Sequence, residues 1–184
     1  MTVKEGQEPL ERLVELLGIY SSAVLTGHLL DEATGGELTP AQYDALTFID
    51  RHGGCSAKAL SEGLRISIPS STRLIDRLVR KHLVDRRESE VDRRLIILSV
   101  LPAGESALGA VRSAHIARLR QALETFQLGE RATLLSMLER FLMAALCDVQ
   151  TVEECCRRCG TEHDGSCVVN EAHIALLGRP IEHT

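Results

Sequence analysis

The residues best suited to chemistry in this sequence are the cysteines that gather near its C-terminal end. Five of the six cysteines follow residue 146, and three of them form the pattern C-x2-C-x3-H-x3-C with a histidine. Three thiolates and one imidazole suit a tetrahedral zinc ion, whereas four thiolates suit an iron–sulfur cluster. The predicted ligands are Cys155, Cys156, Cys159, His163 and Cys167.

Other interpretations of this cluster stay open. The thiols could form a redox switch without a metal, or their spacing could be incidental in an unstructured tail. A disulfide framework is disfavoured in a reducing compartment. Cys55 falls at a predicted helix start and Cys147 on an apolar helix face, so we expect both to be buried as small hydrophobic residues.

A second candidate site is a stripe of serine and arginine on a helix predicted to follow Ser67. At 100° per residue, one face has Ser70, Arg73, Arg77 and Arg80, with Pro69 and Asp76 at its edge, and the other has Ile68, Ser71, Ile75, Leu78, Val79 and His82. An outward stripe of this kind can enter a DNA major groove, because arginine donates two hydrogen bonds to a guanine edge. An ordinary solvated helix face has the same pattern.

The distribution of charge is compatible with a DNA-facing helix but does not distinguish it from a solvated face. Residues 51–94 contain eleven Lys and Arg against six Asp and Glu, a net charge of +5, whereas the whole chain has −5 and the remainder therefore −10. A basic segment in an acidic frame is typical of a surface that faces phosphate groups. Aromatic residues make up 3% of the chain and tryptophan is absent, which argues against a carbohydrate site or a stacking surface for single strands.

Local signals predict the elements that position this stripe. Thr39-Pro40 is typical of a helix start, and that helix is expected to end at 52–54. Ser56 is expected to cap a short helix over 57–62, and Gly63 to leave that helix with a positive φ. With Ser67 capping the next helix, the spacing is that of a helix-turn-helix.

A β-hairpin is predicted to follow, with strands over 83–89 and 94–100. An arginine at the tip of such a hairpin can reach a DNA minor groove. Arg93 and Arg94 are the candidates, and Asp92 would orient the guanidinium.

Long leucine-rich helices are expected on both sides of this region, over 8–31 and after Pro102. Their apolar stripes need a partner, and a second copy of the chain is the simplest one. The predicted regions are a dimerisation helix over 8–35, a DNA-binding region over 36–101, dimerisation helices over 102–151 and a Cys-rich tail over 152–184. We expect no apolar run to be long enough to cross a bilayer, and no secretion signal is seen. Both observations predict a soluble, cytoplasmic protein without a membrane partner.

Over roughly residues 8–150 the sequence resembles the MarR family of bacterial transcription regulators. The likeness rests on Leu38-Thr39-Pro40-Ala41-Gln42-Tyr43-Asp44-Ala45-Leu46, Ala59-Leu60-Ser61-Glu62-Gly63-Leu64, Ser71-Thr72-Arg73-Leu74-Ile75-Asp76-Arg77-Leu78-Val79, Leu83-Val84-Asp85-Arg86, Asp92-Arg93-Arg94 and Pro102-Ala103-Gly104. The implied fold is mainly α with a small β-hairpin wing, that is, a winged helix-turn-helix with long N- and C-terminal dimerisation helices.

The resemblance also implies a homodimer on a pseudo-palindromic operator in double-stranded DNA, and a pocket for a small-molecule effector. Carried over by position, Pro69, Ser70, Thr72, Arg73 and Arg77 take the recognition role, and Arg94 or Arg93 takes the wing role beside Asp92. Leu101 replaces the threonine that caps the following helix in the family. The first helix has no cysteine, so peroxide sensing at that position is not implied.

Three functions follow as hypotheses, and none of them is enzymatic. The first is a dimeric repressor that responds to a metal, iron–sulfur or redox signal through its cysteine cluster. The second is a repressor released by a small organic ligand, with a structural zinc site in the tail. The third is a helical interaction module that does not bind DNA.

Overall fold

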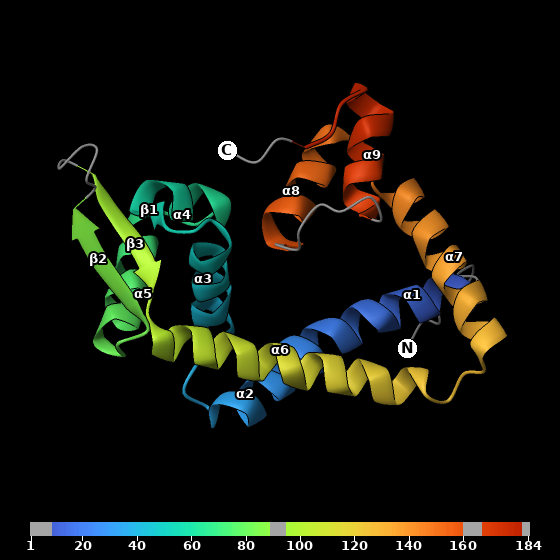
Figure 1. The fold of residues 1–184 in the computed structure, drawn as a ribbon, viewed down its shortest axis with the longest axis horizontal. Helices are drawn as coiled ribbons and strands as arrows, with labels where there is room; N and C mark the ends of the chain where they lie inside the picture. Colours follow the sequence, from blue (N-terminus) through green and yellow to red (C-terminus); the bar gives the residue numbers. More distant parts are fainter. Residues whose placement is uncertain (1–8, 89–94, 160–166, 182–184) are drawn as a thin grey trace, which may run out of the picture. The chain divides into compact units, whose positions relative to one another are not determined.

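The chain is described here by a computed structural model that covers residues 9–88, 95–159 and 167–181, the side chains of residues 157–159 excepted. It divides into two compact units, residues 1–118 and 119–184 (Figure 1). The first unit contains α1 (Pro9–Tyr20), a π-helical segment (Ser21–His28), α2 (Leu29–Thr34), α3 (Pro40–Arg51), β1 (Cys55–Ser56), α4 (Ala57–Gly63), α5 (Ile68–Arg80), β2 (Val84–Glu88), β3 (Ile96–Val100) and most of α6 (Pro102–Leu123). The second contains the end of α6, α7 (Leu128–Ala145), α8 (Val149–Cys159) and α9 (Val168–Leu177). The expected fold class, mainly α with a small β-wing, is confirmed.

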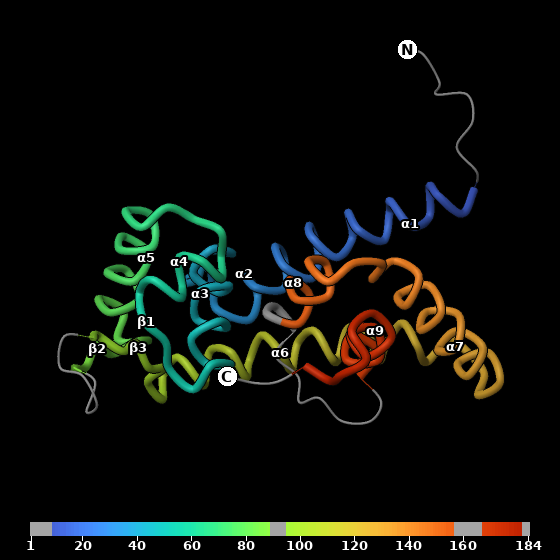
Figure 2. The backbone as a smooth tube through the Cα atoms, turned by 90° about the horizontal axis from the view of Figure 1, so that it is seen from above, coloured from blue at the N-terminus to red at the C-terminus, as the bar shows by residue number. Residues whose placement is uncertain are grey.

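The first helix lies where it was predicted and continues three residues beyond 31, to Thr34. α1, the π-helical segment and α2 form one continuous rod (Figure 2), which ends where Gly35 takes the left-handed conformation at φ 60°. We expected no apolar run long enough to cross a membrane, and this expectation was wrong. The helix over residues 9–34 is long enough, and its most apolar stretch has a mean hydropathy of 1.5, although length and composition are the only evidence. The reason is that no Asp, Glu, Lys or Arg lies between Glu15 and Asp31. A helix that buries its side chains against another protein surface has the same composition, although within this chain 11% of that stretch is buried. His115 of α6 donates a hydrogen bond to the carbonyl oxygen of Leu25 in the π-helical segment.

Local side-chain caps begin the next three helices, as the sequence predicted. At α3, Thr39 Oγ1 accepts from the Gln42 amide at 3.3 Å, and Gln42 Oε1 accepts from the Thr39 amide at 3.1 Å. Ser56 and Ser67 each accept from the amide three residues later, which fixes the starts of α4 and α5. Each cap supplies a partner to a backbone donor that the first helical turn leaves without one. α6 begins at Pro102 even though Leu101 offers no such cap.

Gly63 does not leave α4 with a positive φ, so that prediction was wrong. The left-handed residue in this turn is Arg65, at φ 53°. Gly63 is instead the site of a close approach, because a Cβ there would lie 2.1 Å from Cε2 of Phe48 on α3. The ring of Phe48 occupies the space that any other side chain at Gly63 would need.

The predicted hairpin is present and gains one short strand. The sheet order is β1-β3-β2, fully antiparallel, with Leu98 of β3 opposite Cys55 on one side and Arg86 on the other. β1 was not predicted because two residues are too short for a periodic pattern. The tip, residues 89–94, lies outside the described residues.

One core joins the elements of the first unit. Its buried members include Leu30, Leu38, Leu46, Ile49, Leu60, Ile75, Leu78, Val84, Leu98 and Val111, from α2 through α6. The second unit has a smaller core around Leu146, Val152 and Ala172. The helix-turn-helix and the wing are therefore one packed body that holds α5 in place.

Gly63→Ala is expected to destabilise the protein by about 1–3 kcal/mol, because the added methyl group overlaps the Phe48 ring. Urea unfolding followed by circular dichroism measures the change. The matched control is Gly109→Ala in α6, where a Cβ meets nothing within 4 Å. This control should be neutral or gain about 0.5–1 kcal/mol from helix propensity. Equal midpoints for the two variants would contradict the close-approach assignment.

Candidate nucleic-acid interface

The outer face of α5 is open to solvent. Each residue of the predicted recognition set on this helix, Pro69, Ser70, Thr72, Arg73 and Arg77, is exposed, and so is Arg80. The inner face buries Ser71, Leu74, Ile75 and Leu78. The predicted outward orientation of the serine and arginine stripe is thus observed, while the role of each residue in DNA binding stays a prediction.

Three residues on or just after this helix differ from the expected pattern. Ile68 and His82 were assigned to the buried face, but both are exposed. Leu74 was not assigned to it, and it is buried. Ile68 and His82 lie at or beyond the two ends of α5, where the elements that cover its middle no longer reach, and His82 has already left the helix at φ 55°.

Two hydrogen bonds fix α5 against the preceding helix. Ser71 Oγ donates to the carbonyl oxygen of Ala57 at 3.3 Å, which joins α5 to the start of α4. Ser61 Oγ donates to the carbonyl oxygen of Ile66 at 2.7 Å, which closes the turn between them. Both serines are buried, and a buried hydroxyl is stable only where it has such a partner.

The hydroxyl groups on the outer face differ in what they can offer a ligand. Thr72 Oγ1 donates to the carbonyl oxygen of Ile68 at 3.0 Å, so its proton is already used within the helix. Ser70 Oγ accepts from Ser67 Oγ at 2.9 Å, so its own proton is available to an acceptor. Ser70 can therefore donate to a base edge or a phosphate oxygen, whereas Thr72 presents its methyl group and its lone pairs.

The guanidinium groups of Arg73 and Arg77 are not neutralised by neighbours. Among the side chains that the structure describes, none forms an ion pair with either of them. Two exposed guanidinium groups one turn apart on a helix present a positive strip to an approaching duplex.

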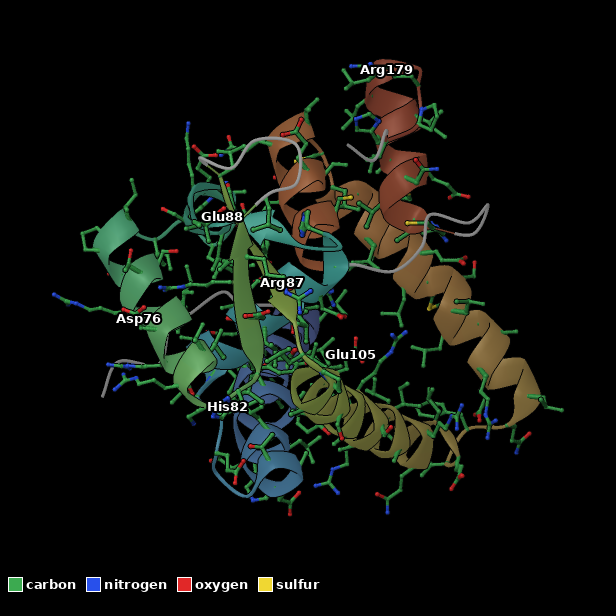
Figure 3. All side chains as sticks on the ribbon, turned by 60° about the vertical axis from the view of Figure 1, so that its left-hand side comes forward. Asp76, His82, Arg87, Glu88, Glu105 and Arg179 are labelled. Carbon is green, nitrogen blue, oxygen red and sulfur yellow. The ribbon has the colours of Figure 1, made fainter. Side chains whose placement is uncertain are left out.

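Asp76, at the edge of this strip, connects α5 to the wing. Its Oδ1 atom lies 2.5 Å from Nη2 of Arg86 on the adjacent strand β2, which runs beside α5 (Figure 3). A second pair, Arg87 Nε to Asp85 Oδ2 at 2.6 Å, lies on the same strand. The hydrogen bond from Arg87 and then the backbone amide of Arg86 hold the pKa of Asp85 below its ordinary value. Exposed pairs add little stability, so the Asp76–Arg86 contact joins α5 to β2 without contributing much to the fold.

The predicted wing residues Asp92, Arg93 and Arg94 lie outside the described residues. What the structure does show is the base of the wing, where β2 and β3 pair from Val84↔Val100 to Glu88↔Ile96. The assignment of the three tip residues to the DNA minor groove stays a prediction.

The predicted metal ligands are only partly visible. Cys155 and Cys156 lie on α8 and Cys167 lies directly before α9, whereas the Cys159 side chain and His163 fall outside the described part of the chain. Within the described residues no three His, Cys, Asp or Glu side chains gather closely enough to hold a metal ion. α8 and α9 pack together through Val152 and Ala172, so the ends that bear these cysteines belong to one small helical hairpin.

The other two cysteines have opposite environments. Cys55 is buried in β1, as predicted, and burial raises the pKa of its thiol to about 11. Cys147 is exposed, so its predicted burial was wrong. α7 ends at Ala145, and Cys147 lies in the connection beyond it, with Sγ 3.8 Å from Asp148 Oδ2.

A helix-turn-helix with an exposed cationic second helix and a β-wing defines a winged-helix DNA-binding protein. A MarR family profile matches residues 37–95. The HTH-type transcriptional regulator Mb0904 of Mycobacterium bovis is 34% identical over 108 residues, 59% of this chain and 74% of that relative. This chain belongs to the MarR family of transcriptional regulators, which are DNA-binding proteins and not enzymes.

Solved structures agree in fold. RV1404 of Mycobacterium tuberculosis matches with a TM-score of 0.63 at 21% identity, over 76% of this chain and 96% of that one. A mutant of MepR from S. aureus, bound to an oligodeoxyribonucleotide, matches with a TM-score of 0.61 at 16% identity, over 76% and 99%. Another relative by sequence, the HTH-type transcriptional regulator YsmB of Bacillus subtilis, is 30% identical over 89 residues. These residues are 48% of this chain and 61% of the relative. The hypothesis of an interaction module without DNA binding finds no support in these comparisons.

Cys55 is expected to resist thiol reagents in the folded protein, because its raised pKa leaves almost no thiolate at neutral pH. Labelling with iodoacetamide, read by peptide mass spectrometry, should modify exposed Cys147 first and Cys55 only after unfolding. Cys55→Ser should leave the native labelling of the other cysteines unchanged. Native labelling of Cys55 as fast as that of Cys147 would contradict its burial.

Proposed function

We propose that the protein is a homodimeric repressor that binds a pseudo-palindromic operator, with one α5 helix in each of two successive major grooves. The observation behind this proposal is the outer face of α5, where Ser70, Arg73 and Arg77 are exposed and the two arginines have no ionic partner among the described residues. Arg94, or Arg93, with Asp92 would enter the flanking minor groove from the wing tip. MepR offers support by its fold, since it was solved with an oligodeoxyribonucleotide.

Dimerisation is supported by large apolar side chains that a single chain leaves in solvent. On α1 these are Leu10, Leu13, Leu16, Leu17 and Ile19; on the C-terminal half of α6, Ile116, Leu119 and Leu123; and on α7, Leu135, Leu138, Phe141 and Leu142. Exposed apolar area on this scale is rare in monomers and marks interfaces. A second copy would bury these residues and would place two α5 helices on one duplex by two-fold symmetry.

The signal that releases DNA is proposed to act through the cysteine cluster, with zinc, an iron–sulfur cluster or thiol oxidation as its chemistry. Cys155, Cys156, Cys159, His163 and Cys167 would supply thiolate and imidazole ligands, which suit both cofactors. The exposure of the described cysteines is compatible with ligand binding or oxidation: Cys155 on α8 is exposed, and Cys156 on α8 and Cys167 before α9 are half-exposed. A change in ligation would alter the hairpin that these two helices form.

One observation favours the small organic effector of the alternative hypothesis, whose structural zinc site in the tail stays a prediction. Thr47 Oγ1 on α3 is buried and has no hydrogen-bond partner among the described residues. Tyr43, one turn earlier on α3, meets the ring of His115 edge-on at 6.4 Å. A buried polar atom without a partner is costly, and a polar group of a ligand would satisfy it.

Arg73→Ala and Arg77→Ala are each expected to weaken operator binding by about 1–3 kcal/mol, because each removes a guanidinium contact to a base edge or a phosphate. Fluorescence anisotropy on a duplex selected from a random library measures the affinity. The control is Arg140→Ala on α7, which removes an exposed arginine of the second unit and should bind as the wild type does. Wild-type affinity in all three variants would exclude α5 as the recognition helix.

Protein purified without oxygen is expected to contain metal bound by the tail. Elemental analysis with sulfide determination distinguishes the outcomes: zinc alone indicates a zinc site, and iron with acid-labile sulfide indicates a cluster. Cys159→Ser should lose the metal, whereas Cys55→Ser should keep it, since Cys55 is buried in β1. Metal-free wild-type protein would contradict the metal site and leave thiol oxidation as the proposed signal.

A further inference from the structure

Ile68, the first residue of α5, is an apolar side chain in a place where burial does not explain it. It is 65% exposed, and between Leu38 and Glu88 it is the one large hydrophobic residue that the structure leaves in solvent. The buried side of α5 begins at Ser71, whose hydroxyl donates to the carbonyl oxygen of Ala57. Ile68 lies one turn earlier, before the helix packs against its neighbours. Nothing within the described part of this unit requires an isoleucine there.

Its surroundings are those of the predicted DNA contact. Ile68 is followed by exposed Pro69 and Ser70, and Arg73 lies further along the open face. The Ser67 cap fixes the backbone at this point, since its hydroxyl accepts from the Ser70 amide. In helix-turn-helix complexes the N-terminal residues of the second helix are the ones that approach base edges.

We propose that Ile68 recognises thymine through the C5-methyl group in the major groove, an inference that rests on the proposed DNA binding by α5. The methyl group of thymine is the one apolar feature that a base pair presents in that groove. Phosphate and sugar offer no comparable apolar contact, so an exposed β-branched side chain among serine and arginine residues fits a thymine position. Ile68 would thus determine sequence specificity, while Arg73 and Arg77 provide the charge.

The test replaces thymine by deoxyuridine, which lacks only that methyl group. A duplex is selected from a random library with the full-length protein, and each symmetric pair of thymines is then replaced in turn. At one such pair we expect the wild-type Kd to rise about fourfold for each half-site, which corresponds to one methyl-sized apolar contact. For Ile68→Ala the thymine and uracil duplexes should bind equally at that pair.

The control variant is Ile174→Ala, which truncates another exposed isoleucine, on α9, and should keep the wild-type preference for thymine. If Ile68→Ala retains that preference, or if the wild type shows none at any thymine, the assignment of Ile68 is overturned while DNA binding by α5 stands. If no duplex is enriched at all, the proposed function fails and this inference fails with it. Unchanged thermal unfolding of Ile68→Ala would confirm that the substitution acts on binding alone.

Discussion

The structure depends on the burial of one side of α5. Ser71, Ile75 and Leu78 enter the core, and the hydrogen bond from Ser71 to Ala57 fixes the helix against α4. α4 in turn can approach α3 only because Gly63 leaves room for the Phe48 ring. Once the inner face is fixed in this way, the helical period places Ser70, Arg73 and Arg77 on the opposite side, where they are exposed.

The same body fixes the wing. Leu98 is fully buried between β1 and β2, and Val84 of β2 shares one core with Ile75 and Leu78 of α5, so the sheet and α5 have a defined relation. A protein that reads DNA with both elements needs this relation, because a helix in the major groove and a wing tip in the minor groove must fit one duplex at once. The long N-terminal helix joins this body through Leu30 and through the contact between His115 and Leu25.

The sequence predicted what local chemistry decides and failed where distant contacts decide. The caps at Thr39, Ser56 and Ser67 act within three residues, and all three were predicted. Periodicity identified the inner face of α5, but it could not show that packing begins only at Ser71, which leaves Ile68 outside. The contact of Phe48 with Gly63, the pairing of β1 with β3 and the exposure of Cys147 all depend on the folded chain. DNA contacts and metal ligands stay predictions, since they need a partner.

The central claim is that two copies of the chain present α5 to one duplex by two-fold symmetry. Hydroxyl-radical footprinting of the wild-type protein on its selected duplex tests this most directly. A symmetric dimer should give two equivalent protected patches, related by symmetry, with centres about one helical turn apart, roughly 34–36 Å. A single asymmetric patch at saturating protein would contradict it.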